Sequence, residues 1–129
     1  SISPISFLTK GIKNRKNAIR SSVLSRMTSK KVRHINGIKT CNFSCWKKDA
    51  ININGFNEKF VGWGREDSEF AVRLLNNGIL RKNLKHLGIA YHIFHIENTR
   101  SNLPQNDDIL ENAIKSKCTW CESGLNVHK

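Results

Sequence analysis

The sequence NGFNEKFVGWGREDSEFAVRLLNNG, Asn54–Gly78, decides the fold because it joins a turn rich in glycine and aromatic residues to a helix. Gly78, directly after two asparagines, is the residue type that commonly ends a helix in a left-handed conformation. The apolar residues before it recur at helical spacing: Phe70, Ala71, Leu74 and Leu75. We therefore predict a helix from about Glu66 to Asn77.

The acidic residues in the first turn of this helix fall on two different faces. Asp67 precedes the apolar residues by three, four and seven positions, so its side chain heads the apolar stripe and is expected to point toward the protein interior. Glu66 lies on another line, with Glu69 and Arg73, whose i,i+4 spacing is typical of a solvated face. An inward carboxylate such as Asp67 needs a partner or a chemical role.

The turn before the helix offers a complementary feature. Gly62 and Gly64 allow close approach of the backbone, and Trp63 between them supplies a flat apolar platform. A ring beside an inward acid is what a sugar-binding site requires, because sugars present apolar C–H faces together with hydroxyl groups.

With these residues, the segment NGFNEKFVGWGREDSEFAVRLL resembles the acceptor-site segment of galactosyltransferase-like enzymes. It is most similar to bacterial family 2 glycosyltransferases that carry a galactosyltransferase-like C-terminal module, over about residues 37–97. The resemblance implies that Asp67 is the catalytic base, that Trp63 packs on the acceptor sugar, and that Gly62, Gly64 and Glu66 shape the same site. Ser68 departs from the longer acidic run of galactosyltransferases proper, which leaves the identity of the acceptor open.

The resemblance also implies a fold and an organisation. We expect an α/β protein, α+β as an isolated fragment, that forms the C-terminal, acceptor-side part of a GT-A nucleotide-sugar transferase, with helices packed on a small mixed sheet. Within a single unit 1–129, residues 1–31 would be a basic helical lead-in, 32–97 the galactosyltransferase-like core and 98–129 a loop and helix. No Asp-x-Asp motif is present. The nucleotide-binding half is therefore expected upstream, and this fragment alone is expected to be inactive.

The expected reaction transfers a sugar, with inversion, from a nucleotide-sugar donor to a saccharide or glycolipid acceptor. In related enzymes a histidine on the strand after the acceptor helix helps to hold a divalent metal. His95 and His92 both match that description, and Mn or Mg suits such a site. Three residues apart on a regular strand, they would face opposite sides, so one of them is the better candidate. Arg100, in the following loop, is expected to meet the diphosphate.

The charge is high and unevenly distributed. The net charge is +12, and residues 10–33 contain nine Lys and Arg but no acid. Apolar residues at loose helical spacing over residues 12–29 predict a helix with a basic opposite face. Two interpretations stay open: a solvated basic helix, which is the commoner case, or a surface that contacts anionic lipid or the phosphate of a sugar-lipid. We expect a cytoplasmic protein, in the second case peripheral at the inner face of the membrane, and no nucleic-acid partner.

Other segments give weaker predictions. Alternation predicts strands within residues 32–46 with a turn at Asn36-Gly37, and a strand within residues 80–96. A short helix is expected from Asp49, and a last helix is expected to be capped by Asn106 or Asp107 and to end at Gly124.

The four cysteines, Cys41, Cys45, Cys118 and Cys121, are interpreted as reduced thiols, with a zinc site as the alternative. Two other classes of function stay open: a basic module that binds nucleic acid or acidic glycan, and a zinc-stabilised structural domain.

Overall fold

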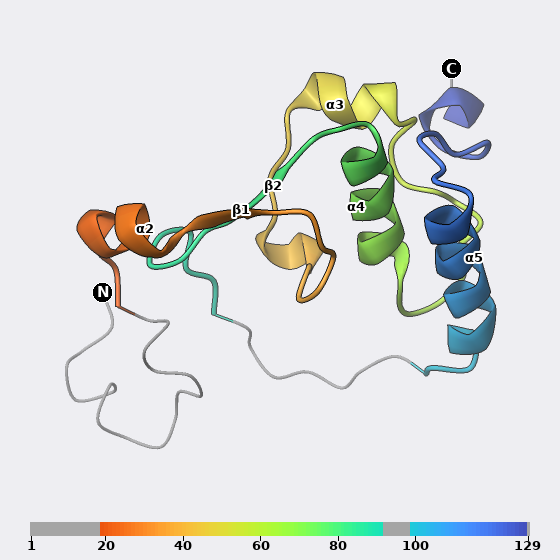
Figure 1. The fold of residues 1–129 in the computed structure, drawn as a ribbon. Helices are drawn as coiled ribbons and strands as arrows, with labels where there is room; N and C mark the ends of the chain where they lie inside the picture. Colours follow the sequence, from red (N-terminus) through yellow and green to blue (C-terminus); the bar gives the residue numbers. More distant parts are fainter. Residues whose placement is uncertain (1–18, 92–98, 129) are drawn as a thin grey trace. The chain divides into compact units, whose positions relative to one another are not determined.

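A computed structural model describes residues 19–91 and 99–128 (Figure 1). The chain divides into two compact units, which are described separately. The first unit consists of Ser1–Lys31 with Lys82–His92, and the second consists of Val32–Arg81 with Ile93–Lys129. Helices and a two-stranded sheet of β1 (Lys30–Val32) and β2 (Arg81–Asn83) make up an α+β fold, as expected.

The described part of the first unit contains the helix α2 (Ser22–Thr28), which serine side chains fix in place. Ser21 caps its N-terminus by accepting a hydrogen bond from the backbone N–H of Leu24 at 3.2 Å. Ser25 is buried and its hydroxyl lies 3.1 Å from that of Ser29. The Ser29 hydroxyl in turn accepts from the backbone N–H of Lys85 at 3.0 Å. The serine side of α2 therefore faces the segment before residue 86, and its apolar side chains are left exposed.

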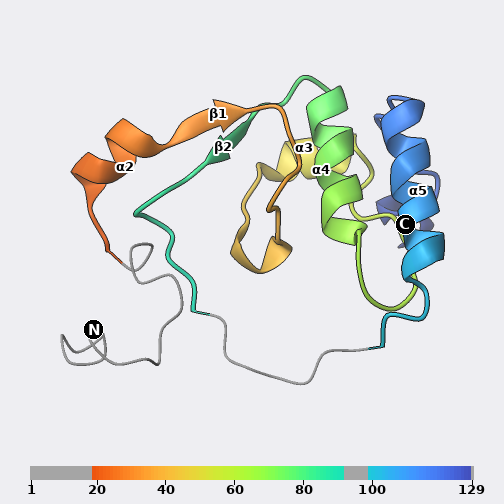
Figure 2. The same ribbon diagram turned by 60° about the horizontal axis from the view of Figure 1, so that its bottom comes forward.

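The second unit is built on two adjacent helices, α4 (Glu66–Asn76) and α5 (Leu103–Lys115), which lie side by side in both ribbon views (Figures 1 and 2). Val72 of α4 packs with Leu110 and Ala113 of α5. On its other side, α4 places Phe70 and Leu74 against Ile53, which follows the short helix α3 (Lys47–Asn52). Apolar residues thus cover α4 from two directions.

The expected helix after the glycine-rich turn is confirmed to within one residue. It ends at Asn76, and Gly78 has a φ of 80°, the left-handed conformation that the sequence predicted. The short helix expected from Asp49 is also present, but it begins two residues earlier, at Lys47, and ends at Asn52.

One expectation for α4 is wrong. Glu69 and Arg73 do not form a solvated pair: they are 1% and 0% exposed, with Arg73 Nε donating to Glu69 Oε1 at 2.7 Å and Nη2 to Oε2 at 2.8 Å. Arg73 also donates to the carbonyl of Ile53. The physical reason is that both sides of α4 are covered, so residues 69–74 are all buried.

The remaining segments differ from the predictions in detail. Residues 32–46 contain the end of β1 and a 3-10 helix (Thr40–Asn42) in place of a strand pair, although Gly37 does form a turn with φ of 72°. The regular strand after α4 is limited to Arg81–Asn83 within residues 80–91. Residues 12–18 and 92–98 lie outside the described part of the chain.

The last helix begins earlier and ends earlier than expected. It starts at Leu103, with Pro104 in its first turn, and ends at Lys115, nine residues before Gly124. Asn106 lies within the helix and is buried, so it is not the cap. Gly124 instead lies against the turn at Asn54: a Cβ on Gly124 would come within 2.0 Å of the Asn54 carbonyl oxygen. A second 3-10 helix covers Leu125–His128.

Among residues 19–91 and 99–128, no helix combines the length and apolar character needed to cross a membrane.

Candidate functional site

The turn that carries Trp63 has an unusual backbone. Gly62, Gly64 and Arg65 all have positive φ, of 75°, 107° and 80°. A Cβ at Gly62 would lie 3.2 Å from Asn102 Nδ2, and one at Gly64 would lie 3.1 Å from Leu103 Cδ1. Both glycines are therefore required by conformation and by the close approach of α5.

Two asparagines hold this turn in place: Asn102, the residue before α5, and Asn106 within α5. The side-chain amide of Asn106 donates to the carbonyl of Val61 at 3.2 Å and to that of Trp63 at 3.4 Å. Asn102 donates to the same Val61 carbonyl at 3.3 Å. Since Asn106 is 1% exposed, these bonds lie in an environment where an unpaired amide would be costly. The two asparagines thus fix the position of the backbone that carries the indole.

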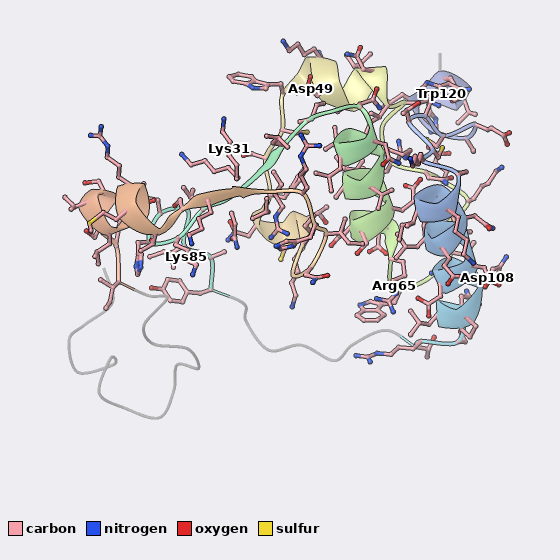
Figure 3. All side chains as sticks on the ribbon, in the orientation of Figure 1. Lys31, Asp49, Arg65, Lys85, Asp108 and Trp120 are labelled. Carbon is pink, nitrogen blue, oxygen red and sulfur yellow. The ribbon has the colours of Figure 1, made fainter. Side chains whose placement is uncertain are left out.

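An ion pair links the same two elements. Arg65, the residue before α4, pairs through Nε with Oδ1 of Asp107 on α5, and both side chains are about half exposed. Figure 3 shows Arg65 where α4 begins, at the end of the helix that lies nearest to the start of α5. An exposed pair of this kind contributes little stability by itself. Its effect is to orient the start of α4 relative to α5.

The carboxylate of Asp67 is partly buried, and both of its oxygens accept hydrogen bonds from Thr40. The backbone N–H of Thr40 donates to Oδ2 at 2.9 Å, and the Thr40 hydroxyl donates to Oδ1 at 2.5 Å. As predicted, Asp67 points toward the protein body, and its two oxygens are fixed by the 3-10 helix Thr40–Asn42.

Glu66, next to Asp67, has one carboxylate oxygen with an unmet hydrogen-bonding requirement. Its Oε2 atom is buried and has no hydrogen-bond partner in the described part of the chain. A buried carboxylate oxygen without a partner is unfavourable. A donor from outside the described residues, such as a ligand hydroxyl, would satisfy it.

Trp63 is 37% exposed and one face of its ring is in contact with a cation. The guanidinium carbon of Arg100 lies 4.4 Å from the ring centroid, a cation–π arrangement. Trp63 was expected to pack on the acceptor sugar and Arg100 to meet the diphosphate, and the structure places the two side chains in contact. The contact of Arg100 with a diphosphate stays a prediction.

The expected metal ligands His92 and His95 lie outside the described residues. Within residues 19–91 and 99–128, no three His, Cys, Asp or Glu side chains gather in a way that could hold a metal ion.

All four cysteines are described and carry free thiols. Cys121 is buried, and its Sγ lies 3.6 Å from the carbonyl oxygen of Asn54.

Sequence reasoning missed Thr40, Asn102 and Asn106. A signal for Asn106 was present: it precedes Leu110 by four residues and Ala113 by seven, so it lies on the apolar stripe of α5. A polar residue on such a stripe is expected to have a buried partner. No comparable signal identified Thr40, which is 27 residues away from Asp67 in the chain.

Comparison with known proteins gives one result. A family model described as the N-terminal domain of galactosyltransferase matches residues 21–96, more than half of the chain. No curated protein matched the chain, and no solved structure did. The matched residues include the glycine-rich turn, Asp67 and Thr40, but not α5.

Proposed function

Because the chain belongs to the family described as the N-terminal domain of galactosyltransferase, it is a galactosyltransferase-like glycosyltransferase domain, and we propose that the start of α4 is its acceptor site. Such a domain implies a nucleotide-sugar donor and a saccharide acceptor in general. The proposed role of this site is to bind the acceptor and to remove the proton from its reacting hydroxyl group.

The observation that carries the proposal is the fixed carboxylate of Asp67. A carboxylate has about four lone-pair positions, and Thr40 occupies one on each oxygen. Acceptor capacity therefore remains for an incoming hydroxyl, while the two bonds from Thr40 restrict rotation of the group. A base that is held in a defined orientation within hydrogen-bond reach is what general base catalysis requires.

The neighbouring residues supply the acceptor contacts. The Trp63 indole offers an apolar face, and Oε2 of Glu66, which has no partner among the described residues, would accept a hydrogen bond from a sugar hydroxyl. Arg100 already lies on the indole, so an acceptor that used the same face would displace it, whereas one on the opposite face would leave it in place. Gly62 and Gly64 set the direction of the indole through the turn that α5 holds.

In the proposed reaction Asp67 accepts the proton of the acceptor hydroxyl as its oxygen attacks the anomeric carbon. The bond from that carbon to the diphosphate breaks in the same displacement, and the configuration is inverted. The resemblance to family 2 enzymes supports a C-terminal position, on a GT-A fold, behind a nucleotide-binding half. It also supports a cytoplasmic role in the synthesis of bacterial surface polysaccharide or lipooligosaccharide.

We also propose a divalent metal, Mn or Mg, which would neutralise the leaving diphosphate. His95 or His92 would hold it. A titration of the full-length enzyme with Mn should show weaker binding for His95→Ala or for His92→Ala, and unchanged affinity in both variants would remove both histidines from the proposal.

The decisive experiment is Asp67→Asn in the full-length enzyme. Asparagine can keep both Thr40 contacts, since its oxygen accepts from the backbone N–H and its amide donates to the hydroxyl oxygen. The substitution thus removes the base and leaves the geometry in place. We expect kcat to fall by roughly 10²- to 10⁴-fold, the usual contribution of general base catalysis.

Asp108→Asn is the matched control, because Asp108 is an exposed carboxylate on α5. It should keep the wild-type rate. Transfer by Asp67→Asn at a rate close to that of Asp108→Asn would exclude Asp67 as the base.

A further inference from the structure

One side of α2 exposes apolar side chains to solvent. Val23 is 67% exposed and Met27 is 75% exposed, and they lie four residues apart on the helix. A basic helix that contacts only water would normally direct such side chains inward, but here Ser25 occupies the buried position. Among the described residues, the apolar side chains of Val23 and Met27 therefore have no covering partner.

The charge of the first unit defines that partner further. Ten of the chain's 22 Lys and Arg belong to this unit, and none of its ten Asp and Glu does. Around α2 the exposed basic side chains are those of Arg20, Arg26, Lys30 and Lys31. A partner must therefore be anionic and must also accept exposed aliphatic side chains.

We propose that the first unit binds the surface of an anionic lipid bilayer through α2 and the basic residues next to it. We call this the α2 surface: Arg20, Val23, Arg26, Met27, Lys30 and Lys31. Anionic headgroups would attract the four basic side chains, and Val23 and Met27 would enter the boundary between headgroups and acyl chains. This contact goes beyond the proposed transferase reaction and does not depend on it.

A bilayer explains the surface better than a nucleic acid does. Binding of single-stranded nucleic acid usually combines basic residues with aromatic side chains on which bases stack. The residues of the α2 surface that lie beside the basic groups are aliphatic, namely Val23 and Met27. Aliphatic side chains gain free energy by leaving water for lipid, which a phosphate backbone cannot offer.

The test uses the 129-residue chain with vesicles of phosphatidylcholine alone or with added phosphatidylglycerol. We expect sedimentation with the anionic vesicles only, and a loss of binding as salt is raised. Lys30→Gln combined with Lys31→Gln should weaken binding by roughly tenfold or more. Lys47→Gln combined with Lys48→Gln is the matched control, since this is also an exposed lysine pair but lies on α3 of the second unit.

The apolar contribution needs its own pair of variants. Val23→Ser should weaken vesicle binding several-fold, and Val127→Ser, an exposed valine of the second unit, should not. Serine and valine have similar helix propensities, so α2 should persist, and circular dichroism checks this.

Equal loss in both lysine pairs would overturn the proposal, because the attraction would then follow net charge alone. It would also be overturned by unchanged binding in Val23→Ser, or by tighter binding to a single-stranded oligonucleotide than to anionic vesicles.

Discussion

The two units of this chain differ in how they are held together. Apart from Ser25, the buried residues of the described part all belong to the second unit, which also holds all ten acids of the sequence with twelve Lys and Arg. The first unit has ten basic residues, no acid and no buried apolar side chain within residues 19–31 and 82–91. Serine and backbone hydrogen bonds replace a core there.

The second unit contains both acids and bases, which can pair inside it, whereas the first unit contains basic groups and no acid. In the second unit, acids pair with bases within α4 and between α4 and α5. In the first unit, basic groups have no acid of their own unit to pair with, so their charge is directed outward. Binding to external anions is the natural consequence.

The largest expected effect concerns the buried pair of α4. Arg73→Met would leave the Glu69 carboxylate buried without its cation, which typically costs about 3–5 kcal/mol in the free energy of unfolding. Urea denaturation followed by circular dichroism would measure it. The same change at Lys115, which pairs with the exposed Glu111 at equal spacing on α5, should cost less than about 0.5 kcal/mol.

Similar losses in the free energy of unfolding for Arg73→Met and Lys115→Met would contradict this difference between the units, because the second unit would not then depend on a buried ion pair. The double variant Glu69→Gln with Arg73→Met should be more stable than Arg73→Met alone, since it no longer buries an unpaired charge.

A smaller effect is expected at the asparagine that holds the glycine-rich turn. Asn106→Leu removes the bonds to the Val61 and Trp63 carbonyls and should destabilise the protein by about 1–3 kcal/mol. It should also raise the quenching of Trp63 fluorescence by acrylamide, in a background in which Trp46 and Trp120 are replaced by phenylalanine. Asn112→Leu, on the exposed side of α5, should change neither quantity, and an identical response in both variants would remove the bracing role of Asn106.

The smallest expected effect is a pH dependence that is confined to the second unit. Burial raises the pKa of the Cys121 thiol above its ordinary value of 9.0, although nearby Arg73 acts in the opposite direction. With a higher pKa in the folded state, the stabilisation is fully present below pH 9 and is lost as pH rises from 9 through the folded-state pKa. The unfolding free energy, measured from pH 7 to pH 10, should therefore fall at the alkaline end.

Cys121→Ala should reduce this alkaline slope, and Cys41→Ala, which removes an exposed thiol, should leave it as it is. If the slope survives in Cys121→Ala, another group is responsible for it.

The helix α4 could be predicted because local signals agree over its length: the acids of the first turn, the apolar spacing and Gly78. The burial of Glu69 and Arg73 could not be predicted, because it depends on tertiary contacts on both sides of α4, with Ile53 on one side and α5 on the other. Spacing alone identifies an i,i+4 pair but does not tell whether one or both sides of its helix are covered. For the same reason the apolar spacing over residues 12–29 predicted a helix with a basic opposite face but could not tell whether Val23 and Met27 would be covered, and the structure leaves them exposed.

The candidate site was predictable only in part. The order of Gly62, Trp63, Gly64 and Asp67 along the chain identified the turn and the acid, since these are local features. Thr40, Asn102 and Asn106 come from segments far away in sequence, and their roles depend on tertiary contacts.

The turn at Asn54 has a consequence for how the second unit forms. Asn54 Nδ2 donates to the Cys121 carbonyl at 2.7 Å, 67 residues later, and Leu125 N donates to the Asn54 carbonyl at 2.9 Å. Contacts at such separation form only after a long loop has closed, which slows folding. On the ribosome, the turn at Asn54 could therefore form its full set of hydrogen bonds only after residues 121–126 have emerged, so this unit should complete its folding after that point of synthesis.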